Sequence, residues 1–526
     1  MLKKIISLVL SIILVYLIIV PCDAETMSDK IENDFDTSSI LVVIKKEYSE
    51  FGKEYYPSDF DNELIESVTV LNPIGPEGNT IGYNLEYWQQ ILSLTLKEPS
   101  KKNVKKAIDA ALENPQVESA NKNYFYTVEM PKVNNAQNNI NLESESNMFA
   151  AVEESNSARS SGFGVFPNDA RFDEQGGLTF VRAQRAWLFA TCDNNEARIG
   201  VMDTGIATHV DIAYNVLLSK NFTDEAGLDD NVGHGTHVAG IIGATGNNLL
   251  GVAGVCWNPS IVNLKVLKCG ADGNGTGEVD WIIRAIHYAQ EKSIKVLNAS
   301  LEIDSITPEN LSSLYAEIQA YNGILVCAAG NTEVNETISD TGYPSLIPAY
   351  NIISVGSCNS DGTIAEYSKF DSIHTDIFAN GNNILSTYTS PSYYRLSGTS
   401  MATAFVTGAI GLLLSINEEF TWTELLVLIL NNADSRTMNI NGAEESVSVL
   451  NILKSVLMAS NTQLGDANRD GSVTSADARL VMRFSSMLES YTDEQAVISD
   501  VNYDSEITAA DARMIQNYAA GLVPSL

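Results

Sequence analysis

Hydrophobic residues follow two alternating patterns between about residues 162 and 460. Short apolar runs typical of buried strands occupy residues 197–202, 261–267, 294–297 and 324–327. Longer segments with helical spacing of their apolar residues occupy 238–244, 278–290 and 400–414. Strands that alternate with helices predict an α/β fold with a parallel sheet flanked by helices. Functional side chains gather at the carboxyl ends of such strands, so the residues after each run are candidates for chemistry.

The regions on either side of this α/β unit have different patterns. Residues 25–130 contain a strand-like run at 39–44 and an amphipathic helical piece at 103–112, which predict a small α+β unit. Residues 131–162 are rich in Asn, Ser, Glu and Ala and predict a flexible, cleavable linker. The α/β unit is expected to span residues 163–460, and the pattern changes again after it.

Residues 1–24 predict a secretory signal peptide. Two lysines precede an apolar run at residues 5–20, and the polar end of the segment offers a cleavage site after Ala24. An uncleaved membrane anchor is the alternative, because the run is long for a signal, whereas Pro21 disfavours a lipid anchor on Cys22. No later segment is expected to span a membrane. We therefore expect a secreted, extracellular protein with no membrane attachment after the signal is removed.

Composition narrows the partners further. A chain of 526 residues is expected to form more than one folded unit. Its 66 acidic and 32 basic residues give a formal net charge of −34, which argues against a nucleic-acid partner and favours cation binding. The cysteines beyond the signal are scattered and odd in number, so we expect neither a disulfide framework nor a metal cage: Cys192, Cys256, Cys269, Cys327 and Cys358.

Ser400 lies where a polar, glycine-bounded turn leads into the apolar segment 400–414. The first turn of a helix has free backbone N–H groups, and the helix dipole favours negative charge there. This position suits a nucleophile whose reaction develops an oxyanion. The alternative is that Thr399 or Ser400 only caps the helix.

Asp203 and His234 supply the partners that such a serine needs. Asp203 ends the strand-like run 197–202, and a buried carboxylate there must be hydrogen-bonded or paired. His234 lies in a Gly-His-Gly-Thr-His motif, where small neighbours let a substrate approach closely. A metal site built from His234 and His237 is the alternative, but no further ligand completes it.

Asn331 follows the run 324–327 and ends another strand. It could be a turn residue. Beside a serine nucleophile, its amide could instead donate to a tetrahedral oxyanion, a contribution of about 10²–10³ in rate.

These blocks together resemble the subtilisin-like serine peptidases (subtilases) in order and spacing over about 300 residues of the chain. The resemblance implies peptide-bond hydrolysis through an acyl-enzyme. Asp203 would orient His234, His234 would act as general base and then acid, and Ser400 would attack the scissile carbonyl. Asn331 and the Ser400 N–H would form the oxyanion hole.

The resemblance also implies the substrate-binding residues. The segment with Gly273, Asn274 and Gly275 is similar to the family's edge segment, which pairs with the substrate backbone. The pocket for the residue before the scissile bond would have Gly342 as its floor and the following walls: Ser300, Leu301, Glu302, Ala328, Ala329 and Gly330. Glu302 replaces a glycine that is usual there, and we hypothesise that its carboxylate favours Lys or Arg in the substrate.

Two further regions match the family. Asp211 and Asn248 stand at positions that hold a structural calcium in many subtilases, and their oxygen atoms suit calcium. Residues 25–130 resemble the inhibitory propeptide, which helps the enzyme fold, blocks its cleft and is then removed. The processing site is expected in the linker 131–162, with Arg159 as one candidate.

The C-terminal region contains a duplicated acidic loop. Oxygen-bearing residues stand at loop positions 1, 3, 5, 9 and 12 of each copy, and the backbone carbonyl of position 7 completes the set that an EF-hand calcium loop requires. The candidate ligands are Asp466, Asn468, Asp470, Ser472, Thr474 and Asp477, then Asp500, Asn502, Asp504, Glu506, Thr508 and Asp511. Ser505 stands where the first copy has Gly471 at the turn.

Two such loop-helix units resemble a dockerin, a small all-α module that attaches secreted enzymes to cohesin-bearing scaffolds. It would span residues 464–526. Residues just after each loop would face the cohesin: Ser475, Ala476 and Arg479, then Ala509, Ala510 and Arg513.

The sequence therefore predicts a secreted, calcium-dependent serine endopeptidase that is made as a zymogen and docked to a cellulosome-like scaffold. A scaffold-docked homologue that is inactive or stays inhibited by its propeptide, acting as a binding protein, is the alternative. A plain calcium-binding protein would explain only the C-terminal repeat.

Overall fold

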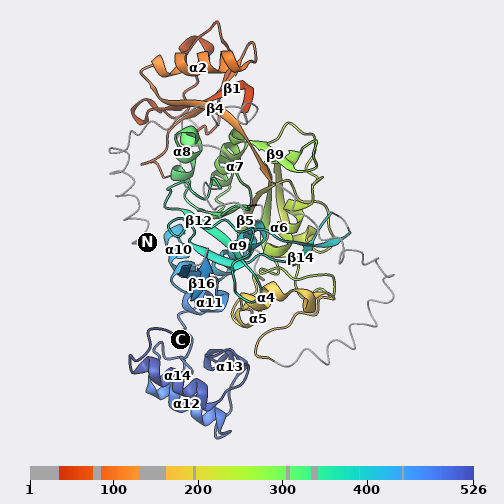
Figure 1. Cartoon of the computed structure of the whole chain (residues 1–526), viewed down its shortest axis with the longest axis vertical. Coiled ribbons are helices and arrows are strands. Elements are labelled where there is room, and N and C mark those ends of the chain that lie inside the picture. The colour runs from red at the N-terminus through yellow and green to blue at the C-terminus, as the bar shows by residue number, and fades with distance from the viewer. Residues whose placement is uncertain are drawn as a thin grey trace.

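The computed structural model describes residues 35–74, 84–128, 162–193, 197–303, 308–332, 342–389, 391–440 and 443–526. The expected signal peptide and residues 131–161 of the expected linker lie outside these ranges. Figure 1 shows three parts in a row, with the α/β part between an N-terminal α+β part and a C-terminal group of helices.

A nine-stranded sheet forms the centre of the molecule. Its order is β16-β17-β13-β12-β11-β10-β5-β7-β6, and all neighbours are parallel except the β16–β17 pair. The strands are β5 (Arg198–Asp203), β6 (Val216–Asn221), β7 (Ser260–Lys265), β10 (Val296–Ala299), β11 (Ile324–Ala328), β12 (Ile352–Cys358), β13 (Ile377–Asn380), β16 (Asp434–Ile440) and β17 (Ala443–Val449). The predicted parallel sheet is confirmed.

Helices cover both faces of this sheet. Val296 and Ile324 belong to the core shared with one set of helices, whereas their neighbours Leu297 and Leu325 belong to the core on the other face. This alternation follows from the two-residue repeat of a strand. The first set is α6 (His234–Gly243), α9 (Thr399–Ile416), α10 (Trp422–Leu430) and α11 (Ile452–Ala459), and the second is α7 (Val279–Glu291) and α8 (Ser312–Ala320).

Helix α9 corrects one expectation. Among the described residues it is the one helix long and apolar enough to cross a membrane by length and composition, although no such segment was expected. Its residues are 89% buried inside the protein, so its apolar character is explained by the core that it fills.

Shorter elements complete the central part. Helices α4 (Gly176–Phe180) and α5 (Ala183–Ala186) precede the first strand of the sheet, and β14 (Ile384–Thr387) pairs with β15 (Tyr393–Leu396). Strand β8 (Lys268–Cys269) pairs with β9 (Gly275–Glu278).

The N-terminal part is the expected α+β unit. It contains β1 (Phe35–Ile44), β2 (Ile65–Val70), β3 (Ile91–Leu96), α2 (Lys101–Glu113) and β4 (Val117–Val128). Its sheet continues into the central part in the order β2-β3-β1-β4-β9-β8, because β4 pairs antiparallel with β9 from Phe125↔Glu278 to Val128↔Gly275. This strand is the long strand between the two parts in Figure 1.

The C-terminal part contains α12 (Ser475–Ser485), α13 (Asp493–Ser499) and α14 (Ala509–Ala519). Helices α12 and α14 follow the two acidic loops, as expected. The short helix α13 precedes the second loop and was not predicted from the sequence.

Candidate active site

Three adjacent strands end at the same level of the central sheet. Ala299 of β10 pairs with Met202 of β5 on one side and with Cys327 of β11 on the other. The residues that follow these three, Asp203, Ser300 and Ala328, therefore meet at one edge. This edge is the carboxyl edge predicted from the apolar runs.

Asp203 and His234 form a buried pair at this edge. His234 Nδ1 lies 2.8 Å from Asp203 Oδ1 and 3.0 Å from Oδ2, and both side chains are about 1% exposed. Burial opposes a charge on the imidazole, yet the Asp203 carboxylate raises the pKa of His234 above its ordinary value, and Asp230 adds to this effect. The pairing leaves Nε2 as the atom able to take a proton from a nucleophile.

Asp230 holds the segment that carries His234, and sequence reasoning missed it. Its Oδ1 accepts hydrogen bonds from the Val232 and Gly233 amides, and its Oδ2 accepts from the Thr236 amide and hydroxyl. These bonds satisfy N–H groups at the start of α6, which begins at His234, four residues earlier than expected. An aspartate four residues before the histidine, at a helix start, was the available signal.

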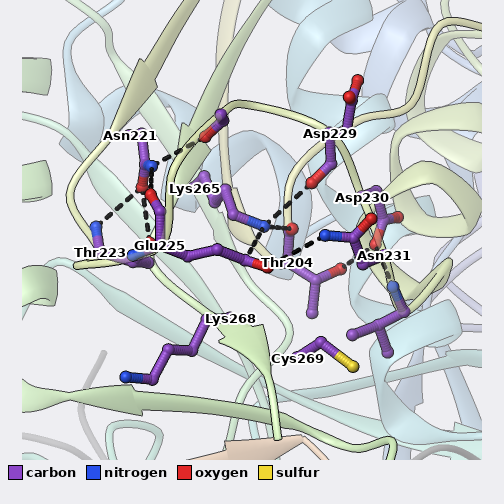
Figure 2. A network of polar contacts seen from close by, with 12 residues as sticks. Thr204, Asn221, Thr223, Glu225, Asp229, Asp230, Asn231, Lys265, Lys268 and Cys269 are labelled. Atoms are coloured by element: carbon purple, nitrogen blue, oxygen red, sulfur yellow. Dashed lines mark hydrogen bonds and ion pairs between the residues drawn. The ribbon is translucent and has the colours of Figure 1, made fainter.

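Thr204 connects this cap to the strand that carries Asp203. Its hydroxyl donates to Asp230 Oδ1 at 2.8 Å and accepts from the Gly235 amide at 2.9 Å. Figure 2 shows the same region from close by, with the buried Lys265 ammonium between Thr204 and Asp229. It donates to their carbonyl oxygens at 2.6 and 3.0 Å and pairs with Glu225 at 3.2 Å.

Ser400 is the second residue of α9, and its amide has no partner within the helix. The Ser300 hydroxyl donates to the Ser400 carbonyl at 3.0 Å and accepts from Asn298 Nδ2 at 2.9 Å. Asn298 Oδ1 in turn accepts from the Thr407 hydroxyl. Strand β10 thus fixes the start of α9 beside the ends of β5 and β11.

Asn331 lies next to the same helix start. Its Oδ1 accepts hydrogen bonds from the Thr399 amide at 3.0 Å and from the Thr399 hydroxyl at 3.2 Å. Because the oxygen is used in this way, Nδ2 is the atom that Asn331 can offer to an oxyanion beside Ser400.

The predicted substrate edge is shifted along the chain. Gly275 begins β9 and pairs with Val128 of β4, but Gly273 and Asn274 form the turn between β8 and β9 instead of the pairing edge. Gly273 has a φ of +84°, a turn conformation that removes it from the strand. The pairing residues that the sequence analysis missed are Thr276 and Gly277.

The pocket residues are brought together, with one correction. A Cβ atom added to Gly330 or Gly342 would lie 2.4 or 3.1 Å from Glu302 Oε1, so this carboxylate reaches both glycines. It also forms an ion pair with Lys369 and accepts from the Asn331 amide at 3.1 Å. The charge expected to attract a basic substrate residue is therefore compensated by Lys369, which the sequence did not single out.

The remaining wall residues lie where the strands end. Leu301 is 2% exposed, and Ala328 and Ala329 are also buried. The residues expected to form the walls and the floor thus come from segments far apart in the chain.

Asp211 and Asn248 are also neighbours. Asn248 Nδ2 donates to Asp211 Oδ1 at 2.8 Å, and Oδ2 accepts from the Val252 amide and from the Tyr393 hydroxyl. These donors satisfy the buried carboxylate without a metal, so calcium at this position stays a prediction.

The His237 side chain is buried and contacts the backbone through its Nε2 atom. Its Nε2 lies 3.0 Å from the carbonyl oxygens of Ile384 and Tyr394, and burial lowers its pKa to about 3. The alternative of a metal bound by His234 and His237 is therefore wrong. All five cysteines beyond the expected signal are free thiols, and all but Cys269 are buried.

The two acidic loops have the same backbone. In the first, the Asp470 and Gly471 amides donate to the two oxygens of Asp466, and in the second the Asp504 and Ser505 amides donate in the same way to Asp500. At position 12, Asp477 and Asp511 accept the amides of Thr474 and Thr508. Ser505 has a φ of +67° where Gly471 has +88°.

These loops suit a calcium ion. Asp466, Asp477, Asp500 and Asp511 are fully buried carboxylates. Burial, and with it the nearby acidic groups, raises the pKa of Asp466. Among the described residues no three His, Cys, Asp or Glu side chains converge, so each loop depends on amide, hydroxyl and carbonyl oxygens as well.

Comparisons with known proteins agree with this architecture. The model of the subtilase family, peptidase S8, matches residues 194–470, and that of the type I dockerin domain matches residues 464–520. The chain is 38% identical over 252 residues to the major intracellular serine protease of Bacillus subtilis, covering 46% of this chain and 76% of the relative. It is 36% identical over 254 residues to thermitase of Thermoactinomyces vulgaris, covering 47% and 85%.

The α/β fold and its site define the class of serine peptidases. The chain belongs to the subtilase family, and it carries a type I dockerin domain at its C-terminal end. A peptidase implies a peptide substrate, and a dockerin implies a cohesin partner.

Proposed function

We propose that the chain is a secreted subtilisin-like endopeptidase that is made as a zymogen and attached by its dockerin to a cohesin-bearing, cellulosome-like scaffold. Asp203, His234 and Ser400 act as its catalytic triad. The observation that carries the proposal is the pairing of the chain's own strand β4 with β9, near the buried Asp203–His234 pair.

The chemistry follows from the geometry. Ser400 Oγ attacks the scissile carbonyl while His234 Nε2 takes its proton, and Asp203 stabilises the imidazolium that forms. The Ser400 amide and Asn331 Nδ2 stabilise the oxyanion. His234 then gives its proton to the leaving amine, and water attacks the acyl-enzyme by the same steps in reverse.

Strand β4 supports the role of residues 25–130 as an inhibitory propeptide. Thr127 pairs with Thr276 of β9 on one side, and its amide lies 3.4 Å from the Glu302 carbonyl on the other. Two strand edges therefore hold this segment as they would hold an extended substrate. Because Thr127 forms a bridge with Glu302, two residues after Ser300, we expect processing C-terminal to Val128.

Calcium is the ion that, in this proposal, binds the two loops and stabilises the folded dockerin. The ligands are the loop residues 466–477 and 500–511, and the bound ion supplies folding free energy to a unit with a small core. The exposed Arg479 and Arg513, one after each loop, remain accessible to a cohesin.

Mass spectrometry of the purified full chain beside Ser400→Ala, both in calcium, tests the proposal. We expect the wild type to be cut C-terminal to Val128 and the variant to stay intact. Two intact proteins that also fail to react with a serine-directed phosphonate would favour the alternative, an inactive docked homologue. Equal trimming of both would show that the cut does not depend on Ser400.

A further inference from the structure

The second calcium loop lies against the peptidase domain. Asp500, at loop position 1, forms a buried ion pair with Arg185 of α5, with 2.7 Å between Asp500 Oδ2 and Arg185 Nη2. Arg185 also donates to the Ser505 hydroxyl at 3.3 Å. Together with Arg182 and Tyr503, these residues form what we call the loop-2 contact.

Tyr503 forms the other half of this contact. The Arg182 and Arg185 guanidinium groups lie 4.1 and 5.2 Å from the centre of its ring. Its hydroxyl accepts a hydrogen bond from Asn451 of the peptidase domain at 3.3 Å. Arg182 is held in place by an ion pair with Asp434 at 2.9 Å.

The two loops differ at the positions that make this contact. Where the second loop has Tyr503, the first has Arg469, which pairs with Glu494 inside the dockerin. Where the second has Ser505, the first has Gly471, and a Cβ atom at Gly471 would meet nothing within 4 Å. Ser505 accepts an unfavourable left-handed φ of +67°, and its hydroxyl contacts Arg185. The contact with Arg185 thus explains why the second loop has Ser505 at the position of Gly471 in the first loop.

An apolar floor extends the same interface. Leu453 and Leu457 of α11 belong to one buried cluster with Val497, Ile498 and Val501 of the dockerin. Phe163, Leu188 and Phe189, from the start of the peptidase domain, pack against this cluster.

We propose that the peptidase domain itself is a partner of the calcium-loaded second loop, and that calcium bound at residues 500–511 closes this interface and stabilises the peptidase domain. The inference rests on the calcium binding proposed above. Arg185 binds the same Asp500 oxygen as the Ser505 amide, so the contact leaves Oδ1 available to the ion.

The direction of the coupling follows from the loop's charges. Four carboxylates, from Asp500, Asp504, Glu506 and Asp511, are close together in sequence, and Arg185 compensates the charge of Asp500 alone. The remaining negative charges repel one another until calcium binds. The ordered loop presents Asp500, Tyr503 and Ser505 to the two arginines. Calcium therefore favours the closed interface, and by linkage the closed interface favours calcium by the same factor.

Tryptophan fluorescence can follow unfolding outside the dockerin, because all five tryptophans lie outside residues 464–526 and four of them, all but Trp88, lie in the peptidase domain. The test compares thermal unfolding of full-length Ser400→Ala protein in calcium chloride and in chelator, with calcium binding measured by calorimetry. The test variant adds Arg185→Gln. The matched control adds Arg479→Gln, which removes the same charge from an exposed dockerin position.

We expect calcium to raise the tryptophan-detected midpoint equally in the parent and in Arg479→Gln. In Arg185→Gln the rise should be smaller by about 3 °C, while the number of bound calcium ions is unchanged and one site binds about tenfold more weakly. Calcium bound at the Asp211 position would add the same shift to every variant, so it cancels in the comparison.

A calcium-dependent rise in Arg185→Gln equal to that of the parent would overturn the proposal. A second pair of variants, Asp500→Asn in the second loop and Asp466→Asn in the first, compares the contributions of the two loops to the calcium-dependent rise. We expect Asp500→Asn to lose more of the rise. Equal losses in this pair, together with a normal Arg185→Gln, would show that the dockerin stabilises the peptidase domain without the loop-2 contact. Absence of calcium binding in the parent would overturn both this inference and the calcium binding on which it rests.

Discussion

The Tyr126 hydroxyl donates a 2.7 Å hydrogen bond to the Val266 carbonyl, so a residue of the N-terminal part is anchored inside the peptidase domain. Its ring is 2% exposed and lies over Gly277, where an added Cβ would meet the ring at 2.6 Å. Gly277 therefore leaves room for a large side chain at this point of the occupied edge.

Replacing Tyr126 by alanine should weaken the hold of the cleaved N-terminal part on the enzyme. Loss of a buried aromatic side chain costs about 3–5 kcal/mol in a well-packed site, so we expect at least about 100-fold weaker binding. Activity recovered on dilution of the processed protein measures this constant. Phe125→Ala, which changes the exposed neighbour on β4, is the control and should alter it much less.

Binding of the cleaved N-terminal part should weaken as the pH rises. Burial, then the nearby Asp280 and Asp36 carboxylates, raise the pKa of Glu278 to about 8 beneath β4. Release of β4 exposes Glu278, whose ordinary value is 4.5. The bound state therefore holds a proton that the free state loses, and affinity falls between about pH 4.5 and 8 and then levels off.

Glu278→Gln tests the origin of this pH dependence. The amide cannot ionise, so the dilution assay should give a flatter pH profile. A variant that keeps the full wild-type slope would assign the effect to other groups at the interface.

Asp230→Asn should lower kcat by about 10- to 100-fold with little change in KM, because the loop that positions His234 loses its cap. The side-chain NH₂ group of an asparagine at this position would face the Thr236 amide and hydroxyl, which are both donors and now bind Asp230 Oδ2. Removal of the negative charge also lowers the pKa of His234, so the acid limb of the kcat/KM profile should move to lower pH. The control is Asp229→Asn, since the exposed Asp229 meets Lys265 through its backbone carbonyl. If the acid limb does not move in Asp230→Asn, Asp230 acts only as a structural cap and its charge does not affect the pKa of His234.

Lys369→Gln should uncover the charge of Glu302 in the pocket. We expect the ratio of kcat/KM for Arg over Leu before the scissile bond to rise about tenfold, as one added charge interaction of about 1.4 kcal/mol would give. The double variant Lys369→Gln/Glu302→Gln should return the ratio to its starting value. A rise that persists in the double variant would mean that Glu302 is not its source.

Local patterns were sufficient to predict most of the fold. The runs before Asp203 and Asn331 are buried strands, and the apolar segment after Ser400 is the core helix α9, because each pattern reports burial of one short segment. Asp203 and His234, which the sequence analysis paired from two short motifs, lie 2.8 Å apart in the structure.

Two of the residues that were missed act across long separations. Lys369 reaches Glu302 from a segment 67 positions away, and Arg185 reaches Asp500 across 315 positions. Neither Arg185 nor Lys369 belongs to a local motif, and no periodicity in the sequence predicts ion pairs between such distant residues. The start of the paired strand at Gly275, two residues after the expected Gly273, has a different cause, since several glycines in one short loop leave the position of the turn undetermined from sequence.

Strand β4 is held along both of its edges, by β9 on one side and by Glu302 on the other. Any chain that replaces it must offer several consecutive residues in an extended form with both rows of backbone groups unengaged. A strand inside a sheet and a residue inside a helix cannot meet this condition without local unfolding. An enzyme anchored among folded scaffold modules would therefore leave them intact and cut exposed loops, linkers and damaged chains within reach.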